Sequence, residues 1–372
     1  MKIQYCSDLH LEFWENRNFL EANPIVPTGE ILILAGDIML FSETYRHKDF
    51  FDFLSKNFKA VYWIPGNHEY YHSNMNGRVG SFREQIRDNV FLLNDTVEII
   101  DDVRFVFSSL WSFIGKEAEH EIWHSLNDFR LIKVGKQKLT PAIYNKLHLE
   151  SKEFLTNALR AKFDGNTVVI THHVPTMMNY PPQYLGDALN MAFASELRPL
   201  IEETQPDYWI YGHHHVHIPA YKIGKTTMLT NQLGYVSANE FLDFNTRAII
   251  EPTPTRQLFL DDLRVPTDCI SYMHRRTAQY ELYKGKWIIV RNYSEFTYWI
   301  CENGLPDLIS FDHDLGIEDE GHPSGMECAK WLVEYCLDNQ LKLPRWLVHS
   351  ANPAGAENIT GLLISFEKKH LK

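Results

Sequence analysis

The chain has 372 residues, of which 44% are hydrophobic and 23% are charged, and its formal net charge is -12. This length is sufficient for two domains with substantial cores, and the composition excludes a fibrous or disordered protein. The acidic balance argues against a protein that coats nucleic acid electrostatically, so a nucleic-acid ligand is expected to be short or an end. Histidine is unusually frequent, with 18 copies, and imidazole is the commonest neutral metal ligand.

Five cysteines are spread over the chain without paired spacing: Cys6, Cys269, Cys301, Cys328 and Cys336. An odd number without such spacing predicts neither a disulfide framework nor a thiolate zinc site, so we expect buried free thiols in a reducing compartment. The N-terminus shows no signal-peptide pattern, and no run of about 18 apolar residues occurs elsewhere. These features predict a cytoplasmic protein without a membrane partner.

Several predicted strands of the first 250 residues end directly in polar side chains. Strands are expected at 1–5, 30–35, 60–64, 91–100, 103–110, 167–170, 208–211, 225–233 and 238–250, with a helix over 47–58. This alternation favours a layered α/β architecture. The clearest strand end is Trp63-Ile64-Pro65-Gly66-Asn67-His68-Glu69, where an apolar run stops at a glycine. A turn after a strand can aim such polar groups into a shared cleft.

Seven residues at these strand ends are oxygen or nitrogen donors: Asp8, His10, Asp37, Asn67, His172, His213 and His215. Asp8 and His10 are two residues apart, so in an extended segment both side chains point the same way. The set can hold two divalent cations with a bridging carboxylate, for which Asp37 is the best candidate. Such donors suit Mn, Fe, Ni or Zn, and we expect Mn to support activity. One Asp-x-His alone is often a chance match, but five such stretches together favour a metal site.

The order and spacing of these residues resemble the calcineurin-like metallophosphoesterases over roughly residues 1–250. The motifs that carry the resemblance are Asp8-x-His10, Gly36-Asp37, Gly66-Asn67-His68-Glu69, His172 and Gly212-His213-x-His215. The resemblance implies a four-layer α/β/β/α sandwich that holds two metal ions. One ion would be bound by Asp8, His10, Asp37 and His215, and the other by Asp37, Asn67, His172 and His213.

The resemblance also implies a reaction. A hydroxide held between two cations can attack phosphorus in line, and His68 would protonate or stabilise the leaving oxygen. Glu69 is left without a metal position and is expected to support the turn. His172 and His173 are adjacent, so the choice of ligand between them stays open. The other histidines, His173, His214 and His217, are expected to lie behind the ligands or on the surface.

The polar segment 111–159 has a helical pattern and is predicted to cap the site. Trp111, Asn127 and Arg130 are its candidate substrate contacts, although aromatic residues at such spacing more often belong to a core. Gly36-Asp37 is not followed by the Asp-Arg-Gly of the protein serine/threonine phosphatases, which disfavours a phosphoprotein substrate. We therefore expect a small phosphodiester, a nucleotide or an RNA end. The alternative within the enzyme class is a cyclic-nucleotide phosphodiesterase without an RNA role.

Two prolines in the segment 251–256 predict a linker between domains at 1–250 and 257–372. In the second domain, strands are expected at 258–260, 287–290, 308–311 and 346–348, and helices at 294–303, 325–339 and 354–370. This alternation predicts a small flavodoxin-like parallel sheet, whose ligand crevice lies at the carboxyl ends of the strands. Four residues at these strand ends would meet in that crevice: Asp261, Asp262, Asp312 and His349.

Three stretches of the second domain resemble the receiver-like domain described as processing cyclic phosphates, over about residues 257–372: Leu258-Phe259-Leu260-Asp261-Asp262-Leu263-Arg264-x-Pro266, Ile309-Ser310-Phe311-Asp312-His313-Asp314-Leu315-Gly316 and His349-Ser350-x-Asn352-Pro353-x-Gly355-x-x-Asn358. The resemblance adds His313 and Asn352 to the candidate residues of the pocket. The acid pair and Asp312 are similar to the metal site and phosphoacceptor of a receiver, which implies bound Mg, but no fifth strand ending in a lysine is found. The resemblance implies that His313 and His349 act as general acid and base on a 2',3'-cyclic phosphate. Two alternatives stay open: a degenerate receiver whose acids cap helices, and a nucleotide-sensing regulatory protein with this domain as its output.

Overall fold

The computed structural model describes residues 1–163, 165–252, 256–272, 282–316 and 323–370. The chain divides into two compact units, Met1–Thr253 and Pro254–Lys372. Within the described residues, no helix is long and apolar enough to cross a membrane. All five cysteines are free thiols, and Cys301 alone among them is exposed.

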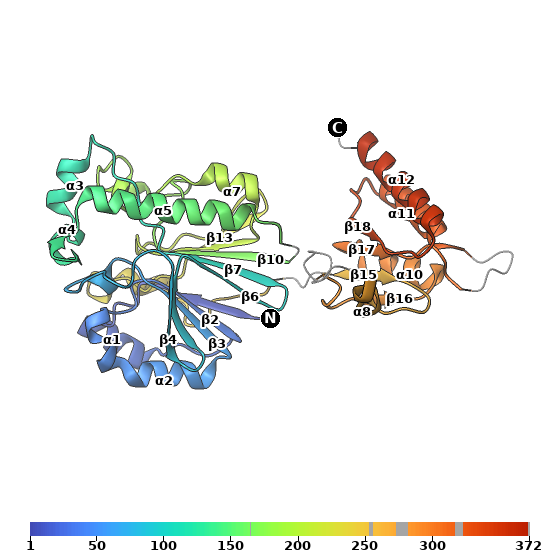
Figure 1. Cartoon of the computed structure of the whole chain (residues 1–372). Coiled ribbons are helices and arrows are strands. Elements are labelled where there is room, and N and C mark those ends of the chain that lie inside the picture. Colours follow the sequence, from blue (N-terminus) through green and yellow to red (C-terminus); the bar gives the residue numbers. More distant parts are fainter. Residues whose placement is uncertain (164, 253–255, 273–281, 317–322, 371–372) are drawn as a thin grey trace. The chain divides into compact units, whose positions relative to one another are not determined.

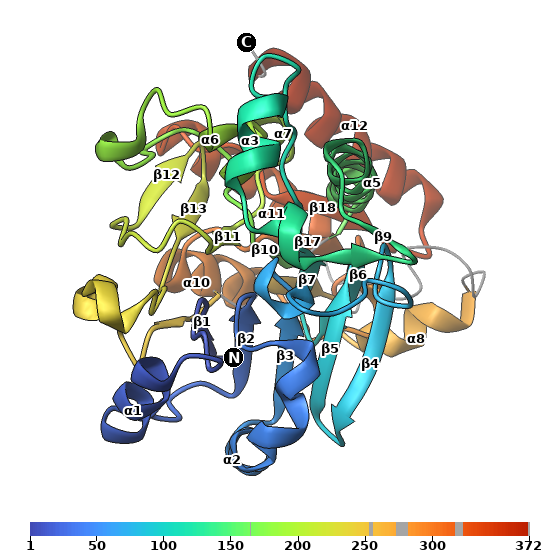
Figure 2. The ribbon, with the colours of Figure 1, turned by 90° about the vertical axis from the view of Figure 1, so that its left-hand side faces the viewer.

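Two six-stranded sheets build the first unit. The first has the order β14-β1-β2-β3-β5-β4 and consists of β1 (Ile3–Cys6), β2 (Ile31–Ala35), β3 (Ala60–Ile64), β4 (Phe82–Arg87), β5 (Val90–Asn94) and β14 (Ile249–Ile250). The second has the order β12-β13-β11-β10-β7-β6 and consists of β6 (Thr96–Ile100), β7 (Val103–Ser108), β10 (Asn166–Thr171), β11 (Tyr208–Ile210), β12 (Tyr221–Ile223) and β13 (Thr226–Leu229). The inner strands of each sheet run parallel, and Figure 2 shows both rows of strands from one end.

Strand β2 illustrates how the sequence places a sheet between two apolar layers. All five of its residues are buried. Ile33 and Ala35 face the core between the sheets, whereas Leu32 and Leu34 face the layer that contains helix α2 (Lys48–Asn57). Because side chains alternate along a strand, a strand covered on both sides must be apolar throughout.

Helices close the sandwich on both outer faces, as Figure 1 shows. Helices α1 (Trp14–Ala22) and α2 cover the first sheet, and α5 (Pro141–Arg160) and α7 (Arg198–Thr204) cover the second. The cap over one end consists of α3 (Glu119–Ser125), α4 (Asp128–Leu131) and the hairpin of β8 (Lys133–Val134) and β9 (Gln137–Lys138). The predicted α/β/β/α sandwich with a helical cap is confirmed.

Two predicted strands are wrong. The segment 91–100 is not one strand, because the chain crosses between the sheets at Asp95: β5 pairs with β3, and β6 pairs with β7. Asp95 has φ 43°, in the left-handed backbone region that interrupts a strand. The segment 238–250 forms a short 3-10 helix at Glu240–Asp243, and only Ile249–Ile250 pair with β1. Phe241 packs on α1 instead, with its ring 4.9 Å from that of Phe19.

Asp95 also carries a buried carboxyl group that accepts from Ser108 Oγ at 2.6 Å and Ser151 Oγ at 3.3 Å. Burial raises the pKa of this carboxyl to about 6. The buried carboxyl group is therefore accommodated in its protonated form at low pH, and this contribution to stability is lost as the pH rises through about 6. We expect Asp95→Asn to raise the free energy of unfolding by about 1–3 kcal/mol near pH 8 and to change it little near pH 4. Denaturant unfolding at both pH values measures this, with exposed Asp88→Asn as the control. An equal effect at both pH values would contradict the prediction.

The second unit is a four-stranded parallel sheet with the order β16-β15-β17-β18. Its strands are β15 (Gln257–Leu260), β16 (Ile288–Val290), β17 (Leu308–Phe311) and β18 (Arg345–Val348), and its helices include α8 (Pro266–Cys269), α10 (Tyr293–Asn303), α11 (Gly325–Asp338) and α12 (Pro353–His370). This is the order of the first four strands of a flavodoxin-like sheet, so the predicted receiver-like fold is confirmed. No fifth strand extends the sheet within the described part of the chain.

Candidate metal centre

The seven predicted donors lie at the carboxyl ends of five strands of the first unit. Asp8 and His10 follow β1, Asp37 follows β2, Asn67 follows β3, His172 follows β10, and His213 and His215 follow β11. The ligand atoms of Asp8, His10, Asp37 and His215 lie within 4.8 Å of one another, and those of Asp37, His172 and His213 form a second group of this kind. Asp37 belongs to both groups, as a bridging carboxylate must.

Unusual backbone conformations accompany these donors. Five of them have a positive φ: Asp8 (55°), His10 (46°), Asp37 (53°), His213 (81°) and His215 (53°). The expected extended conformation of 8–10 is therefore wrong, and the turn holds its donors through bonds from Asp8 N to Gly36 O (2.9 Å) and from His10 N to Asp37 O (3.0 Å). Strain of this kind persists where the surrounding structure enforces it, and it clusters at functional sites.

Three imidazoles are oriented by acceptors on the side away from the centre. Nδ1 of His10 lies 3.1 Å from Glu12 Oε1, Nδ1 of His215 lies 2.8 Å from Glu240 Oε2, and Nδ1 of His172 lies 2.9 Å from Ala35 O. Each acceptor favours a proton on Nδ1 and so leaves the Nε2 lone pair for the centre. Nε2 of His215 lies 3.3 Å from Asp8 Oδ1, and Nε2 of His172 lies 3.4 Å from Asp37 Oδ2. An oxygen acceptor behind the ring is the usual support of a metal-binding histidine.

The geometry favours His172 over His173 as a ligand. Nε2 of His172 points to Asp37 and lies 3.1 Å from His213 Nδ1. Both ring nitrogens of His173 are engaged elsewhere, with Tyr144 Oη at 3.2 Å and Ser109 O at 3.1 Å. Burial and the charge of His172 lower the pKa of His173 to about 3, which keeps it neutral behind the ligands. His214 is buried against Gln232, and His217 is exposed.

Asn67 provides a test of whether a cation fits. Its Nδ2 donates to Asp128 Oδ1 (2.9 Å) and Tyr71 Oη (3.2 Å), which turns its Oδ1 away from both. That oxygen is buried and has no hydrogen-bond partner among the described residues. An unpaired buried carbonyl oxygen is costly, and a cation would satisfy it. The oriented imidazoles, the shared carboxylate and this oxygen therefore fit a centre of two divalent cations.

Asp128 lies in the cap, 61 residues beyond Asn67, and holds the Asn67 amide in place. We expect Asp128→Ala to weaken metal binding about 10- to 100-fold, the usual effect of removing a residue that orients a ligand. Titration of the metal-stripped protein with Mn measures the change. Tyr71→Phe, which removes one of the two donors to Asp128 Oδ1, is expected to have a smaller effect. An unchanged Mn affinity in Asp128→Ala would disprove this role.

The loop around Gly66 is held by Glu69, which is fully buried. Its carboxylate accepts hydrogen bonds from the main chain of Asp37 (3.0 Å), Ile38 (2.8 Å) and Gly66 (2.7 Å) and from Trp63 Nε1 (2.9 Å). A Cβ atom on Gly66 would overlap the side chains of Asp37 and His172, so only glycine fits there. Glu69 therefore joins the ends of β2 and β3. The sequence predicts its support of the turn after β3 but not the link to β2.

His68 stands beside the donors and is engaged at both ring nitrogens. Nδ1 lies 2.8 Å from Glu12 Oε1, and Nε2 lies 3.2 Å from Tyr235 Oη. Burial lowers the pKa of His68, but the charges of Asp37 and Glu12 outweigh burial and raise it above its usual value. Burial alone would raise the pKa of Glu12, yet the bonds from His10 and His68 hold it at about 2. Glu12 thus stays charged and fixes the orientation of His68.

Comparison with known proteins identifies the family. The profile of the calcineurin-like phosphoesterases matches residues 1–217. The chain belongs to this family. A second profile, that of the cyclic-phosphate processing receiver domain, matches residues 256–365. Both resemblances predicted from the motifs are confirmed, and the first unit is a metal-dependent phosphoester hydrolase by its family.

The chain is also similar to individual proteins. Uncharacterized protein L509 of Acanthamoeba polyphaga mimivirus is 31% identical in an alignment of 294 residues that covers 70% of this chain and 99% of that protein. The crystal structure of phosphopantetheinyl hydrolase (PptH) from Mycobacterium tuberculosis superposes with a TM-score of 0.51 at 17% identity and covers 68% of this chain and 97% of its own. A dimetal phosphatase from Danio rerio gives a TM-score of 0.37 at 14% identity, covering 62% and 87%. The PptH match shows a shared fold.

The sequence did not reveal the residues that support the phosphoesterase centre: Glu12, Tyr71, Asp128, Tyr235 and Glu240. Glu12 follows the Asp-x-His motif by two residues, a spacing that an inspection for carboxylates beside ligands would have found. Asp128 lies between Asn127 and Arg130, which were the predicted substrate contacts. Glu240 gave no signal, because it lies in a segment that was expected to form a strand.

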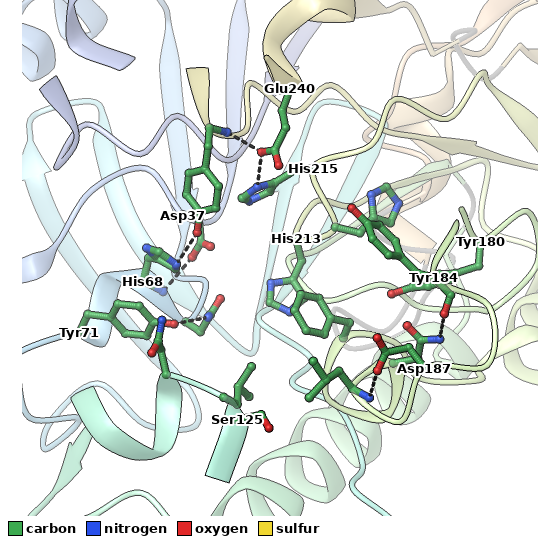
Figure 3. Close-up of a pocket in the computed structure, with 18 residues that line it drawn as sticks. Asp37, His68, Tyr71, Ser125, Tyr180, Tyr184, Asp187, His213, His215 and Glu240 are labelled. Carbon is green, nitrogen blue, oxygen red and sulfur yellow. Dashed lines mark hydrogen bonds and ion pairs between the residues drawn. The ribbon is translucent and has the colours of Figure 1, made fainter. Parts of the chain in front are cut away.

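A cavity of about 340 Å³ opens over the phosphoesterase centre. Figure 3 shows Asp37, His68 and Tyr71 on one side, Tyr180, Tyr184 and Asp187 on the other, and His213 between them. Of the predicted cap contacts, Asn127 lines the cavity, and the buried Trp111 belongs to the core. Arg130 does not line the cavity and is bonded to Asn127 Oδ1 at 2.7 Å.

The predicted residues of the receiver-like unit gather in two groups at the carboxyl ends of its strands. Asp261, Asp262 and Asp312 form a cluster, and His349 Nε2 lies 3.1 Å from Asp261 Oδ2. His313 and Asn352 meet at Asp314, where His313 Nδ1 lies at 2.7 Å and Asn352 Nδ2 at 3.2 Å from the same carboxylate oxygen. The roles of these six residues stay predictions.

Proposed function

We propose that the first unit is a phosphodiesterase, and that its substrates are monoanionic phosphodiesters of nucleotides or RNA ends, including 2',3'-cyclic phosphates. The observation that carries the proposal is the charge of the cavity wall. None of the described residues that line the cavity is a lysine or an arginine, and Asp187 and Glu240 add negative charge. Enzymes that hold a highly charged transferring phosphoryl group often use Arg or Lys clamps beside metal ions. A diester carries one negative charge, which the metal centre alone can balance.

The far wall of the cavity supports a nucleoside as part of the substrate. Tyr180 and Tyr184 line it on the side opposite Asp37 and His68, as Figure 3 shows. Leu189 and Phe193 also line the cavity. Tyrosine and phenylalanine rings stack on any base, with about 1–3 kcal/mol for each base. The matched profile of the second unit, which is named for cyclic-phosphate processing, supports a cyclic phosphate as the reacting group.

Each residue of the centre has a role in the proposed reaction. Two cations, when bound, would activate a water molecule and neutralise charge on the phosphoryl oxygens. Asp8, His10, Asp37 and His215 would hold one, and Asp37, Asn67, His172 and His213 the other. His68 lines the cavity and is oriented by Glu12 at Nδ1. Its Nε2, which lies 3.2 Å from Tyr235 Oη, would give a proton to the leaving oxygen.

The substrate class is tested by comparing kcat/KM for bis(p-nitrophenyl) phosphate and p-nitrophenyl phosphate with Mn. We expect the diester to be preferred by at least about tenfold. Tyr184→Ala is expected to raise KM for a 2',3'-cyclic nucleotide about tenfold and to leave kcat nearly unchanged, because it removes stacking far from the reacting bond. The exposed His217→Ala is the matched control. A preference for the monoester would contradict the proposal.

A comparison of two variants with the same substrate shows which unit carries out the reaction. With a 2',3'-cyclic nucleotide, Asp37→Ala is expected to abolish hydrolysis, whereas Asp312→Ala is expected to leave the step of the first unit intact. Loss of hydrolysis in Asp312→Ala, with full activity in Asp37→Ala, would place the reaction in the second unit.

A further inference from the structure

The pocket of the receiver-like unit contains an arginine where the resemblance to a receiver places a magnesium ion. The carboxylate oxygens of Asp261, Asp262 and Asp312 lie within 4.8 Å of one another, close enough to share a cation. The Arg264 guanidinium lies between two of them, with Nε 2.7 Å from Asp261 Oδ2 and Nη2 2.8 Å from Asp312 Oδ2. A permanently charged side chain therefore already fills the cationic position.

Asp261 has no acceptor site left for a metal. Its Oδ1 accepts from the main-chain N–H groups of Leu263 (2.9 Å) and Arg264 (2.5 Å). Its Oδ2 lies 2.7 Å from Arg264 Nε and 3.1 Å from His349 Nε2. A carboxylate offers about four lone-pair sites, and here each has a partner. Mg prefers nearly octahedral oxygen ligands at about 2.0–2.1 Å and is not served by a saturated carboxylate.

Asp312, the residue that matches the phosphoacceptor of a receiver, is also engaged at both oxygens. Its Oδ1 accepts from the main-chain N–H of His313 at 2.8 Å, and its Oδ2 is paired with Arg264. The side chain of Asp312 is only 6% exposed. A phosphoryl group could reach Oδ2 only if Arg264 moved away.

The neighbouring network holds Arg264 and His349 in these positions. The Arg291 guanidinium donates from Nη1 to Arg264 O at 2.7 Å and to Asp261 O at 3.0 Å. His349 is fixed at Nδ1 by Ser310 Oγ at 2.7 Å, and Ser310 Oγ is in turn 2.7 Å from Tyr283 Oη. With both ring nitrogens occupied and its ring stacked on Phe259, His349 is a structural part of the pocket.

We infer that this pocket is a metal-free site in which Arg264 provides the resident positive charge, and that Asp312 is not a magnesium-dependent phosphoacceptor. The inference is independent of what the first unit hydrolyses, because it concerns only the residues around Arg264. The predicted Mg ion of the second unit does not fit these residues.

The first test counts metal ions in the full chain. The protein is stripped with a chelator and titrated with Mn, and bound Mn is measured by electron paramagnetic resonance. We expect the same number of ions per chain in the wild type and in Asp312→Asn, and fewer in Asp37→Asn. Asp314→Asn, which removes an exposed acid of the same pocket outside the Arg264 contacts, is the matched control. An ion that disappears in Asp312→Asn but not in Asp314→Asn would overturn the inference.

A second test needs no variant and so does not depend on how substitutions fold. The wild-type chain is incubated with acetyl phosphate and Mg, and the peptide that contains Asp312 is analysed by mass spectrometry. We expect no phosphoryl adduct on Asp312. An adduct on Asp312 that forms with Mg and is absent with a chelator would overturn the inference.

Discussion

Asp37→Asn is expected to lower kcat for a phosphodiester by about 10³-fold or more and to release metal from the first unit. Asp37 is the member common to both donor groups. A neutral amide cannot bridge two cations as a carboxylate does, and metal ions contribute several kcal/mol of transition-state stabilisation. The measurement is kcat with bis(p-nitrophenyl) phosphate, together with metal content by elemental analysis.

The substitution is chosen so that folding is preserved. Asn tolerates the positive φ of residue 37, and its amide oxygen can still accept the hydrogen bond from the main-chain N–H of His68, now 2.9 Å from Asp37 Oδ1. Asp88→Asn, on an exposed residue far along the chain, is the control for the loss of one charge. Wild-type activity in Asp37→Asn at wild-type metal content would exclude Asp37 as the bridge.

The donors could be predicted because each follows an apolar strand. A parallel sheet buries its strands, so polar side chains collect where the strands end, and the carboxyl ends of neighbouring strands meet at one edge. Asp37, Asn67 and His172 each follow a strand whose apolar run is plain in the sequence. The sheet order that brings them together depends on long-range pairing, which the sequence pattern does not contain.

Residues that act through a ligand were harder to find. Asp128 reaches Asn67 across 61 residues, and Glu240 reaches His215 across 25, so no local spacing links them. The break at Asp95 has a related cause: apolar residues stand on both sides of it, and only pairing assigns β5 and β6 to different sheets. Arg264 stands in a motif that the sequence singled out, but its position between two acids required the folded turn.

His68→Ala is expected to slow the reaction according to the leaving group. Its imidazole borders the cavity and is held by Glu12 at 2.8 Å, a geometry suited to proton donation. General acid catalysis contributes about 10²–10⁴-fold where the leaving group needs a proton. Nitrophenolate needs little help, whereas the alkoxide of a dinucleotide needs a proton. We therefore expect a loss of about tenfold with bis(p-nitrophenyl) phosphate and about 10³-fold with a dinucleoside monophosphate, measured as kcat.

The contrast between the two substrates separates an acid from a metal ligand. Loss of a ligand would lower both rates together and reduce bound Mn, as expected for Asp37→Asn. Loss of the acid leaves the Mn content unchanged and widens the gap between good and poor leaving groups. His217→Ala, on an exposed histidine four residues after His213, should change neither rate. Equal losses on both substrates, with less Mn bound, would make His68 part of the metal centre, because only a ligand acts on every leaving group alike.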